Sequence, residues 1–325
     1  MTASSVGRMR DMLLRWRGSG PGWGYRPESP PCAEPTVLAS LALLASSTED
    51  PGSAREHSPD CRAALDASAA WLASLQHADG SVGISAALPA PHWSTALALL
   101  LWMARDVEPK ARRRAADWLL AQQGRAWERP EGTPFGHDTS IPGWAWVEGT
   151  HSWLEPTAWA ILALERAGHH DHARVTDGRR LIRDRALRSG GWNYGNSQVF
   201  GTDLRPQPGP TGLALLALAG SDSPESPPVE RGCDYLTRVL PATRAPQSLC
   251  WGLLGLAAFD RRPVPAEAWL ESAMDKAVTR SDRSVQLAYL LLAAAPRALV
   301  VLGIERASPR PQQNGGESNA SERSP

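Results

Sequence analysis

Six almost wholly apolar segments recur along the 325-residue chain, and each has a length typical of a helix. A helix that is apolar on every side must be buried, so each segment predicts a helix in the interior of the protein. Each opens with a hydroxyl residue, which suits the first turn of a helix. These residues are Thr36, Thr95, Thr157, Thr211, Ser248 and Ser284. Their intervals are close to those of helical-hairpin repeats, with loop insertions in the first half of the chain.

A segment with one apolar stripe precedes each apolar segment, and it predicts an outer helix that packs against an inner one. Four of these stripes are clear, within residues 65–76, 111–122, 232–239 and 266–277. The other two, residues 6–16 and 174–187, are rich in arginine and are assigned more by their position than by their pattern. The chain therefore predicts six helical hairpins, a number that can close a ring.

Glycine and tryptophan concentrate in the long connections between outer and inner helices, as in PGWGYRPESPPCAEPT and GWAWVEGTHSWLEPT. Loops longer than about a dozen residues are usually functional or disordered, and tryptophan argues against disorder. In a ring of hairpins these connections emerge on one face, where a cavity would open. We expect a single toroid over residues 1–305, followed by a disordered tail at 306–325 that lacks apolar periodicity.

Charge and cysteine content narrow the function classes. The 34 basic residues balance the 34 acidic ones, so the overall charge does not favour binding to nucleic acid. The four cysteines lie far apart without a C-x-x-C motif, which favours reduced thiols over disulfides or a cysteine zinc site. The apolar run at 285–304 is interrupted by Gln286 and Pro296, among others, and the N-terminus lacks a secretory apolar core. We expect a soluble cytoplasmic protein that touches a membrane surface at most peripherally, to collect lipid.

Several segments resemble the prenyltransferase and squalene-cyclase repeat, with most similarity to squalene-hopene cyclase-type repeats. They are LASLQHADGSVG, SGGWNYGN, PGWGY and GWAWVEGTHSWLEPTAWAILAL, and the resemblance covers roughly residues 1 to 300. It implies an all-α fold, an (α/α)6 toroid in which inner helices line a central cavity and outer helices surround them.

The motifs of two catalytic branches of that family are missing. Protein prenyltransferases hold zinc through Asp, Cys and His at late inner-helix starts, where this chain offers only Cys250, so we expect no metal and no cofactor. Class II cyclases carry an acidic D-x-D-D motif, which is absent here. Its place is taken by Cys-Ala-Glu-Pro-Thr at 32–36 and Trp-Leu-Glu-Pro-Thr at 153–157. The resemblance thus sets Glu34 and Glu155 at the third position of the motif, as candidate catalytic acids.

Tryptophan is unusually frequent, with 14 residues against 3 Phe and 4 Tyr. Protonation of an alkene forms a cation that the face of an indole ring can stabilise, and burial would keep a glutamic acid protonated. We therefore predict an isoprenoid ligand and a set of substrate-binding residues in the loops and inner-helix starts. The set is Trp23, Trp93, Trp144, Trp146, Trp153, Trp159, Trp192, Trp251, His151 and Asp138.

Other interpretations of these residues stay open. The tryptophans could pack between hairpins, and the two glutamates could favour the positive end of a helix. His151 and Asp138 could be ordinary loop residues. The main functional hypothesis is a terpene-cyclase-like protein that binds, and in the stronger form cyclises, an apolar isoprenoid. The alternatives are a non-catalytic toroid that binds a lipid or a protein, and a polysaccharide-active (α/α)6 enzyme that pairs Glu155 with Asp138 or Glu148.

Overall fold

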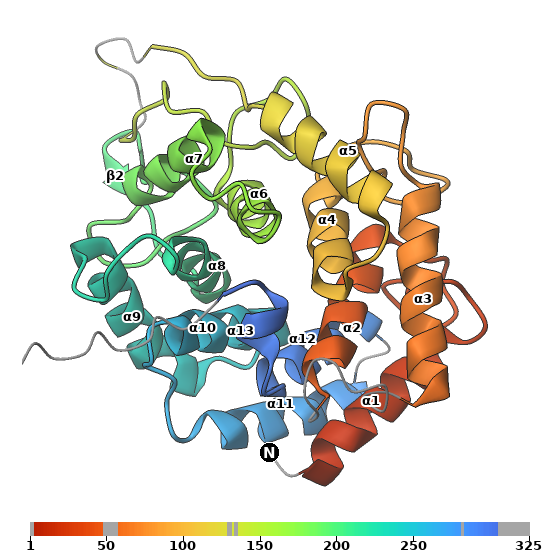
Figure 1. Ribbon diagram of the computed structural model, residues 1–325. Coiled ribbons are helices and arrows are strands. Elements are labelled where there is room, and N and C mark those ends of the chain that lie inside the picture. The colour runs from red at the N-terminus through yellow and green to blue at the C-terminus, as the bar shows by residue number, and fades with distance from the viewer. Residues whose placement is uncertain (1–2, 48–57, 129–131, 133–135, 281–282, 305–325) are drawn as a thin grey trace, which may run out of the picture.

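Six inner helices form a closed ring, as the six apolar segments predict (Figure 1). They are α2 (Ala33–Ala45), α4 (Ser94–Arg105), α6 (Leu154–Arg166), α8 (Pro208–Leu218), α10 (Pro246–Ala258) and α12 (Ser284–Ala294). Each contacts the next, and α12 contacts α2, which closes the ring. The computed structural model describes residues 3–47, 58–128, 132, 136–280 and 283–304.

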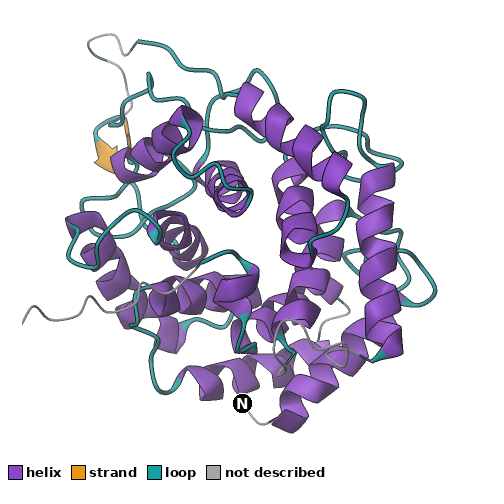
Figure 2. Ribbon diagram, viewed as in Figure 1, coloured by secondary structure: helices purple, strands orange, loops and turns teal. Residues whose placement is uncertain are grey.

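Six outer helices surround this ring, including the two that the sequence assigns by position. They are α1 (Ala3–Arg17), α3 (Pro59–Ser74), α5 (Pro109–Ala121), α7 (Ala173–Asp184), α9 (Pro227–Val239) and α11 (Ala266–Arg280). The predicted all-α toroid is confirmed (Figure 2). None of the described helices is long and apolar enough to cross a membrane. The predicted tail at 306–325 lies outside the described residues.

Three small elements supplement the hairpins. Strands β1 (Gln198–Val199) and β2 (Thr202–Asp203) pair antiparallel in the connection between α7 and α8. A 3-10 turn (Leu240–Ala242) follows α9. The apolar run at 285–304 is divided into α12 and α13 (Ala298–Val301). Pro296 explains the break, because the residue before a proline is disfavoured in helical conformation, and Ala295 is extended with ψ of 134°.

One hydrogen-bond arrangement joins loop and inner helix in three hairpins, and we call it the Trp–Thr clamp. The backbone N–H of Trp144 donates to Oγ1 of Thr157 over 2.9 Å, and that hydroxyl lies 3.3 Å from the carbonyl of Trp144. The indole N–H of Trp144 donates to the carbonyl of Leu119 near the end of α5. The same bonds link Trp23 to Thr36 and Leu13, and Trp192 to Thr211 and Ile182.

The clamp explains two features of the sequence. The threonine hydroxyls at the starts of the apolar segments hold the preceding loop, which is a more specific role than the helix start that we predicted. The glycine before each tryptophan leaves room for the hydroxyl. A Cβ atom on Gly22, Gly143 or Gly191 would lie 2.4, 2.5 or 2.8 Å from the threonine Oγ1 of its hairpin.

Replacing Thr157 by valine should lower the free energy of unfolding by about 1–3 kcal/mol, because the buried N–H of Trp144 loses its acceptor while the side-chain shape is kept. Urea unfolding followed by tryptophan fluorescence measures this. Thr176→Val, at an exposed position on α7, is the matched control and should change stability far less. Equal effects of the two substitutions would contradict a stabilising clamp.

Candidate functional site

Each predicted acid is the second residue of an inner helix, Glu34 in α2 and Glu155 in α6, and a proline follows each of them. Glu34 and Glu155 are far apart in the sequence, and α4 separates their helices in the ring. Their carboxyl groups are nevertheless close enough that the charge of Glu34 raises the pKa of Glu155. The fold therefore brings both candidate acids to one site. Both side chains remain partly exposed.

Two tyrosines hold the carboxyl group of Glu34. The hydroxyl of Tyr25 donates to Oε2 of Glu34 over 2.5 Å, and that of Tyr289 donates to Oε1 over 3.3 Å. Burial raises the pKa of Glu34, whereas these two hydrogen bonds lower it. Burial also raises the pKa of both tyrosines, so they remain protonated donors. Because the effect of burial outweighs that of the two hydrogen bonds, the pKa of Glu34 stays above its ordinary value.

The environment of Glu155 favours its protonated form. Burial, together with the charge of Glu34, raises the pKa of Glu155 to about 7, while a hydrogen bond from the side chain of Trp159 opposes the rise. Two carboxyl groups whose surroundings separate their proton affinities can take different roles, one as an acid and one as an anion. The raised pKa of Glu155 lets it keep a proton closer to neutral pH than an ordinary glutamate does.

Three aromatic side chains form a continuous row across the ring beside these carboxyl groups. The rings of Trp159 and Trp251 meet edge to face at 5.1 Å, and those of Trp251 and Tyr289 at 5.5 Å. The three residues come from α6, α10 and α12, and all are almost completely buried. We call them the aromatic row. Its ring faces carry partial negative charge that can stabilise a cation.

A pocket of about 500 Å³ opens beside Glu34 at the end of the ring where the inner helices begin, and Glu155, Trp159 and Trp251 are not among its lining residues. Tyr25, Glu34 and Tyr289 form part of its wall, so the carboxyl group of Glu34 is reached directly from the pocket. The remaining wall comes mostly from the starts of α10 and α12 and from Arg26. In volume it falls within the usual range of small-molecule sites.

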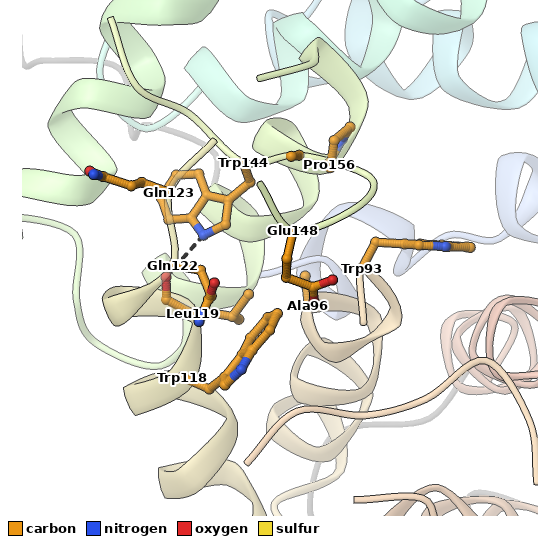
Figure 3. Close-up of a pocket in the computed structure, with 10 residues that line it drawn as sticks. Trp93, Ala96, Trp118, Leu119, Gln122, Gln123, Trp144, Glu148 and Pro156 are labelled. Atoms are coloured by element: carbon orange, nitrogen blue, oxygen red, sulfur yellow. Dashed lines mark hydrogen bonds between the residues drawn. The ribbon is translucent and has the colours of Figure 1, made fainter. Parts of the chain in front are cut away.

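The other predicted site residues lie elsewhere. Trp23, Trp144 and Trp192 are 1%, 4% and 0% exposed and belong to the Trp–Thr clamps, so their main contacts are structural. Figure 3 shows Trp144 bonded to Leu119 beside a small pocket that Trp93 also lines. Trp146 packs edge to face against Trp93 at 5.0 Å.

The polar candidates are also separate from the two glutamates. His151 and Trp153 line a different pocket, over the connection that precedes α6. Asp138 accepts hydrogen bonds from Ser140, and its carboxylate lies 3.7 Å from Arg180. Of the ten predicted binding residues, Trp159 and Trp251 belong to the aromatic row, and the side chain of Trp159 hydrogen-bonds to Glu155.

Sequence reasoning missed Tyr25 and Tyr289 as partners of Glu34. A signal for Tyr289 was present, because a hydroxyl-bearing ring in a wholly buried helix needs a hydrogen-bond partner. Tyr25 follows the first Gly-Trp motif and gave no comparable signal, since loop tyrosines are commonly solvated. The pairing of residues 25, 34 and 289 depends on ring closure between α12 and α2.

Replacing Glu155 by glutamine should make the protein more stable at pH 8 than the wild type. The pKa of Glu155 is 4.5 in the unfolded chain and about 7 in the folded protein, so the folded protein binds this proton more tightly. The free energy of unfolding of the wild type therefore decreases as the pH rises from 4.5 to 7. The shift of about 2.5 pKa units corresponds to a difference on the order of 3 kcal/mol. Urea unfolding at pH 4.5 and pH 8 measures it. Parallel pH profiles for wild type and variant would contradict the raised pKa.

Comparisons with known proteins identify the fold. No protein-family model matches the chain, and no curated protein matches it. Among solved structures, the chain is similar to a variant of the type II terpene cyclase MstE from Scytonema in complex with its substrate geranylgeranyl dihydroxybenzoate. The TM-score is 0.58 at 14% identity, over 93% of this chain and 97% of that chain.

A protein from Actinoplanes is similar with a TM-score of 0.55 at 18% identity, over 93% of this chain and 99% of that one. At such identities the likeness concerns the fold alone. The chain therefore has a toroid of the terpenoid-cyclase type, and nothing in the likeness is specific to squalene-hopene cyclases.

Proposed function

We propose that this protein binds an apolar isoprenoid in the centre of the ring and cyclises it by acid catalysis, with Glu155 as the proton donor. The observation that carries the proposal is the position of a carboxyl group with a pKa of about 7 next to both an anionic partner and a row of aromatic rings. The raised pKa makes Glu155 a weaker acid but keeps its proton available near neutral pH, and the aromatic rings can stabilise the cation that protonation of an alkene would form.

The reaction balances without a cofactor. The O–H bond of Glu155 breaks as its proton forms a C–H bond with one alkene carbon, and the π electrons supply that bond. The cation left on the other carbon is attacked by a second alkene of the same chain, which forms a ring and a new cation. Loss of a proton from the final cation restores an alkene. The product is an isomer of the substrate, because one proton is added and one is lost. The proton released in the last step replaces the one that Glu155 donated.

Glu34 contributes as a fixed negative charge. When Glu155 gives up its proton, two neighbouring carboxylates result, and their repulsion is relieved by a cation between or beside them. The hydroxyls of Tyr25 and Tyr289 hold Glu34 in position before the reaction, so little reorganisation is needed when charge develops. The aromatic row adds cation–π stabilisation from the opposite helices.

The structure offers less support for polysaccharide hydrolysis. That hypothesis pairs Glu155 with Asp138 or Glu148. The carboxyl group whose charge acts on Glu155 is Glu34, and Glu148 instead lies 2.7 Å from Nδ1 of His92. A non-catalytic toroid would use the same cavity and the same aromatic row, and it differs from a cyclase only in turnover.

Glu155→Gln should abolish turnover while ligand binding remains. The purified protein is incubated with linear polyprenyl substrates, and the organic extract is analysed by mass spectrometry. The wild type should give a cyclised product. General acid catalysis contributes about 10²–10⁴-fold, so the variant should lose at least about 100-fold in rate. The control Glu148→Gln removes a nearby carboxylate that contacts His92 and should keep the activity. Binding without product in the wild type would favour the non-catalytic toroid.

The pH profile of turnover should fall as pH rises through about 7, because Glu155 then loses the proton that it donates. Replacing Glu34 by glutamine removes the negative charge that raises the pKa of Glu155, so the fall should move to lower pH. Initial rates of product formation from pH 5 to pH 9 for both proteins measure this. If the two profiles coincide, the coupling between the carboxyl groups does not govern the reaction.

A further inference from the structure

A second pocket, of about 250 Å³, lies over the connections before α6 and after α7. It shares no lining residue with the pocket that reaches Glu34. Its wall combines two guanidinium groups, two imidazoles, small hydroxyl groups and two indoles. These residues are Arg125, Trp127, His137, Thr139, Ile141, His151, Ser152, Trp153, Arg185 and Asn196. Because none of the described lining residues is acidic, the pocket favours an anion.

Arg185 is the most informative residue of this wall, because it is 4% exposed and yet charged. Its Nη1 donates to the carboxylate of Asp184 and to the carbonyl of Asp138. Its Nε is buried and has no hydrogen-bond partner among the described residues. Leaving a donor of a buried charged group without an acceptor costs free energy, which an oxygen atom of a ligand would recover.

The Nη1 atom of this guanidinium group has hydrogen-bond partners within the protein and the Nε atom has none among the described residues, which indicates the kind of ligand that would suit it. Asp184 and the backbone of Asp138 fix Nη1, so the group is oriented before any ligand binds. A guanidinium group can bind a carboxylate through two parallel N–H···O bonds, which are among the strongest that arginine forms, and Nε is a donor of this group that has no partner among the described residues. A planar carboxylate therefore matches this group.

The rest of the wall indicates a flat apolar body attached to the carboxylate. Trp127 and Trp153 supply indole surface, and the ring of His151 lies 4.5 Å from that of Trp153. Ile141 adds an aliphatic contact. Aromatic side chains pack well against a flat ring through offset or edge contacts. The hydroxyl oxygen of Ser152 accepts a hydrogen bond of 2.8 Å from the backbone N–H of Gly143, which holds this side of the wall in place.

We propose that this pocket is a binding site for a small aromatic carboxylate, with Arg185 as the principal anion contact and Trp127 and Trp153 as the surface for the ring. The site is independent of the chemistry proposed for Glu155. It gives His151 and Trp153 a binding role different from the isoprenoid contact that the sequence suggested.

Titration calorimetry with benzoate and with benzamide tests the proposal, since the two have the same shape and only benzoate is charged. Benzoate should bind at least about tenfold more tightly than benzamide, as expected for charge-assisted hydrogen bonds. Arg185→Lys keeps the charge but loses the paired geometry, so it should weaken benzoate at least about tenfold. Arg183→Lys, in the last turn of α7 two residues before Arg185 and paired with Asp222, is the matched control and should bind like the wild type.

Two further variants keep the test decisive. If Arg185→Lys does not fold by circular dichroism, Trp127→Ala at a more exposed part of the wall should still weaken benzoate severalfold. Glu155→Gln should leave benzoate binding unchanged, which separates this site from the proposed catalytic centre. Failure of benzoate to bind at millimolar concentration, equal affinity for benzamide, or wild-type affinity in the Arg185 and Trp127 variants would each overturn the assignment.

Discussion

The fold depends on how the long loops are fastened to the starts of the inner helices. In three hairpins a single threonine hydroxyl binds both the backbone N–H and the carbonyl of a tryptophan in the loop. The indole of that tryptophan reaches back to the outer helix. Each clamp thus ties outer helix, loop and inner helix together with hydrogen bonds that are shielded from water, where an unpaired partner would be costly.

This fastening makes the end of the ring where the inner helices begin a rigid support for chemistry. Glu34 and Glu155 each lie two residues before the threonine of a clamp, so the same bonds that hold the loop also fix the first turn that carries the carboxyl group. The consequence is precise placement of two acids from helices that are not neighbours in the ring. Catalytic groups on helices are held more accurately than groups on loops.

The two hairpins give the two glutamates different surroundings. The surroundings of Glu34 include two tyrosine hydroxyls, which stabilise a negative charge. Those of Glu155 include mainly apolar and aromatic surface and the charge of Glu34 itself, which favour the protonated form. Two residues in equivalent positions of a repeat therefore have different hydrogen-bond partners and charged neighbours, without any difference in their own sequence motif, Glu-Pro-Thr.

The sequence by itself determined the secondary structure and the architecture. Six apolar segments, each with a preceding amphipathic segment, predict buried inner helices and outer helices that cover them, because an all-apolar helix must be covered on every side. The resemblance to the prenyltransferase and squalene-cyclase repeat implied their arrangement in a toroid. The sequence also marked Glu34 and Glu155, because the family resemblance sets them at the third position of the D-x-D-D motif. The division of the last apolar run into α12 and α13 could have been read from Pro296, because proline disfavours helix in the residue before it.

Tertiary structure alone decided which residues share a site. The tryptophans look alike in sequence, yet Trp144 closes a clamp, Trp153 lines a polar pocket and Trp251 joins the aromatic row. Helical periodicity tells that a side chain is buried but not against which distant helix. Tyr289 meets Glu34 only because the last inner helix closes the ring against the first, and that contact is a property of the assembled toroid rather than of either segment.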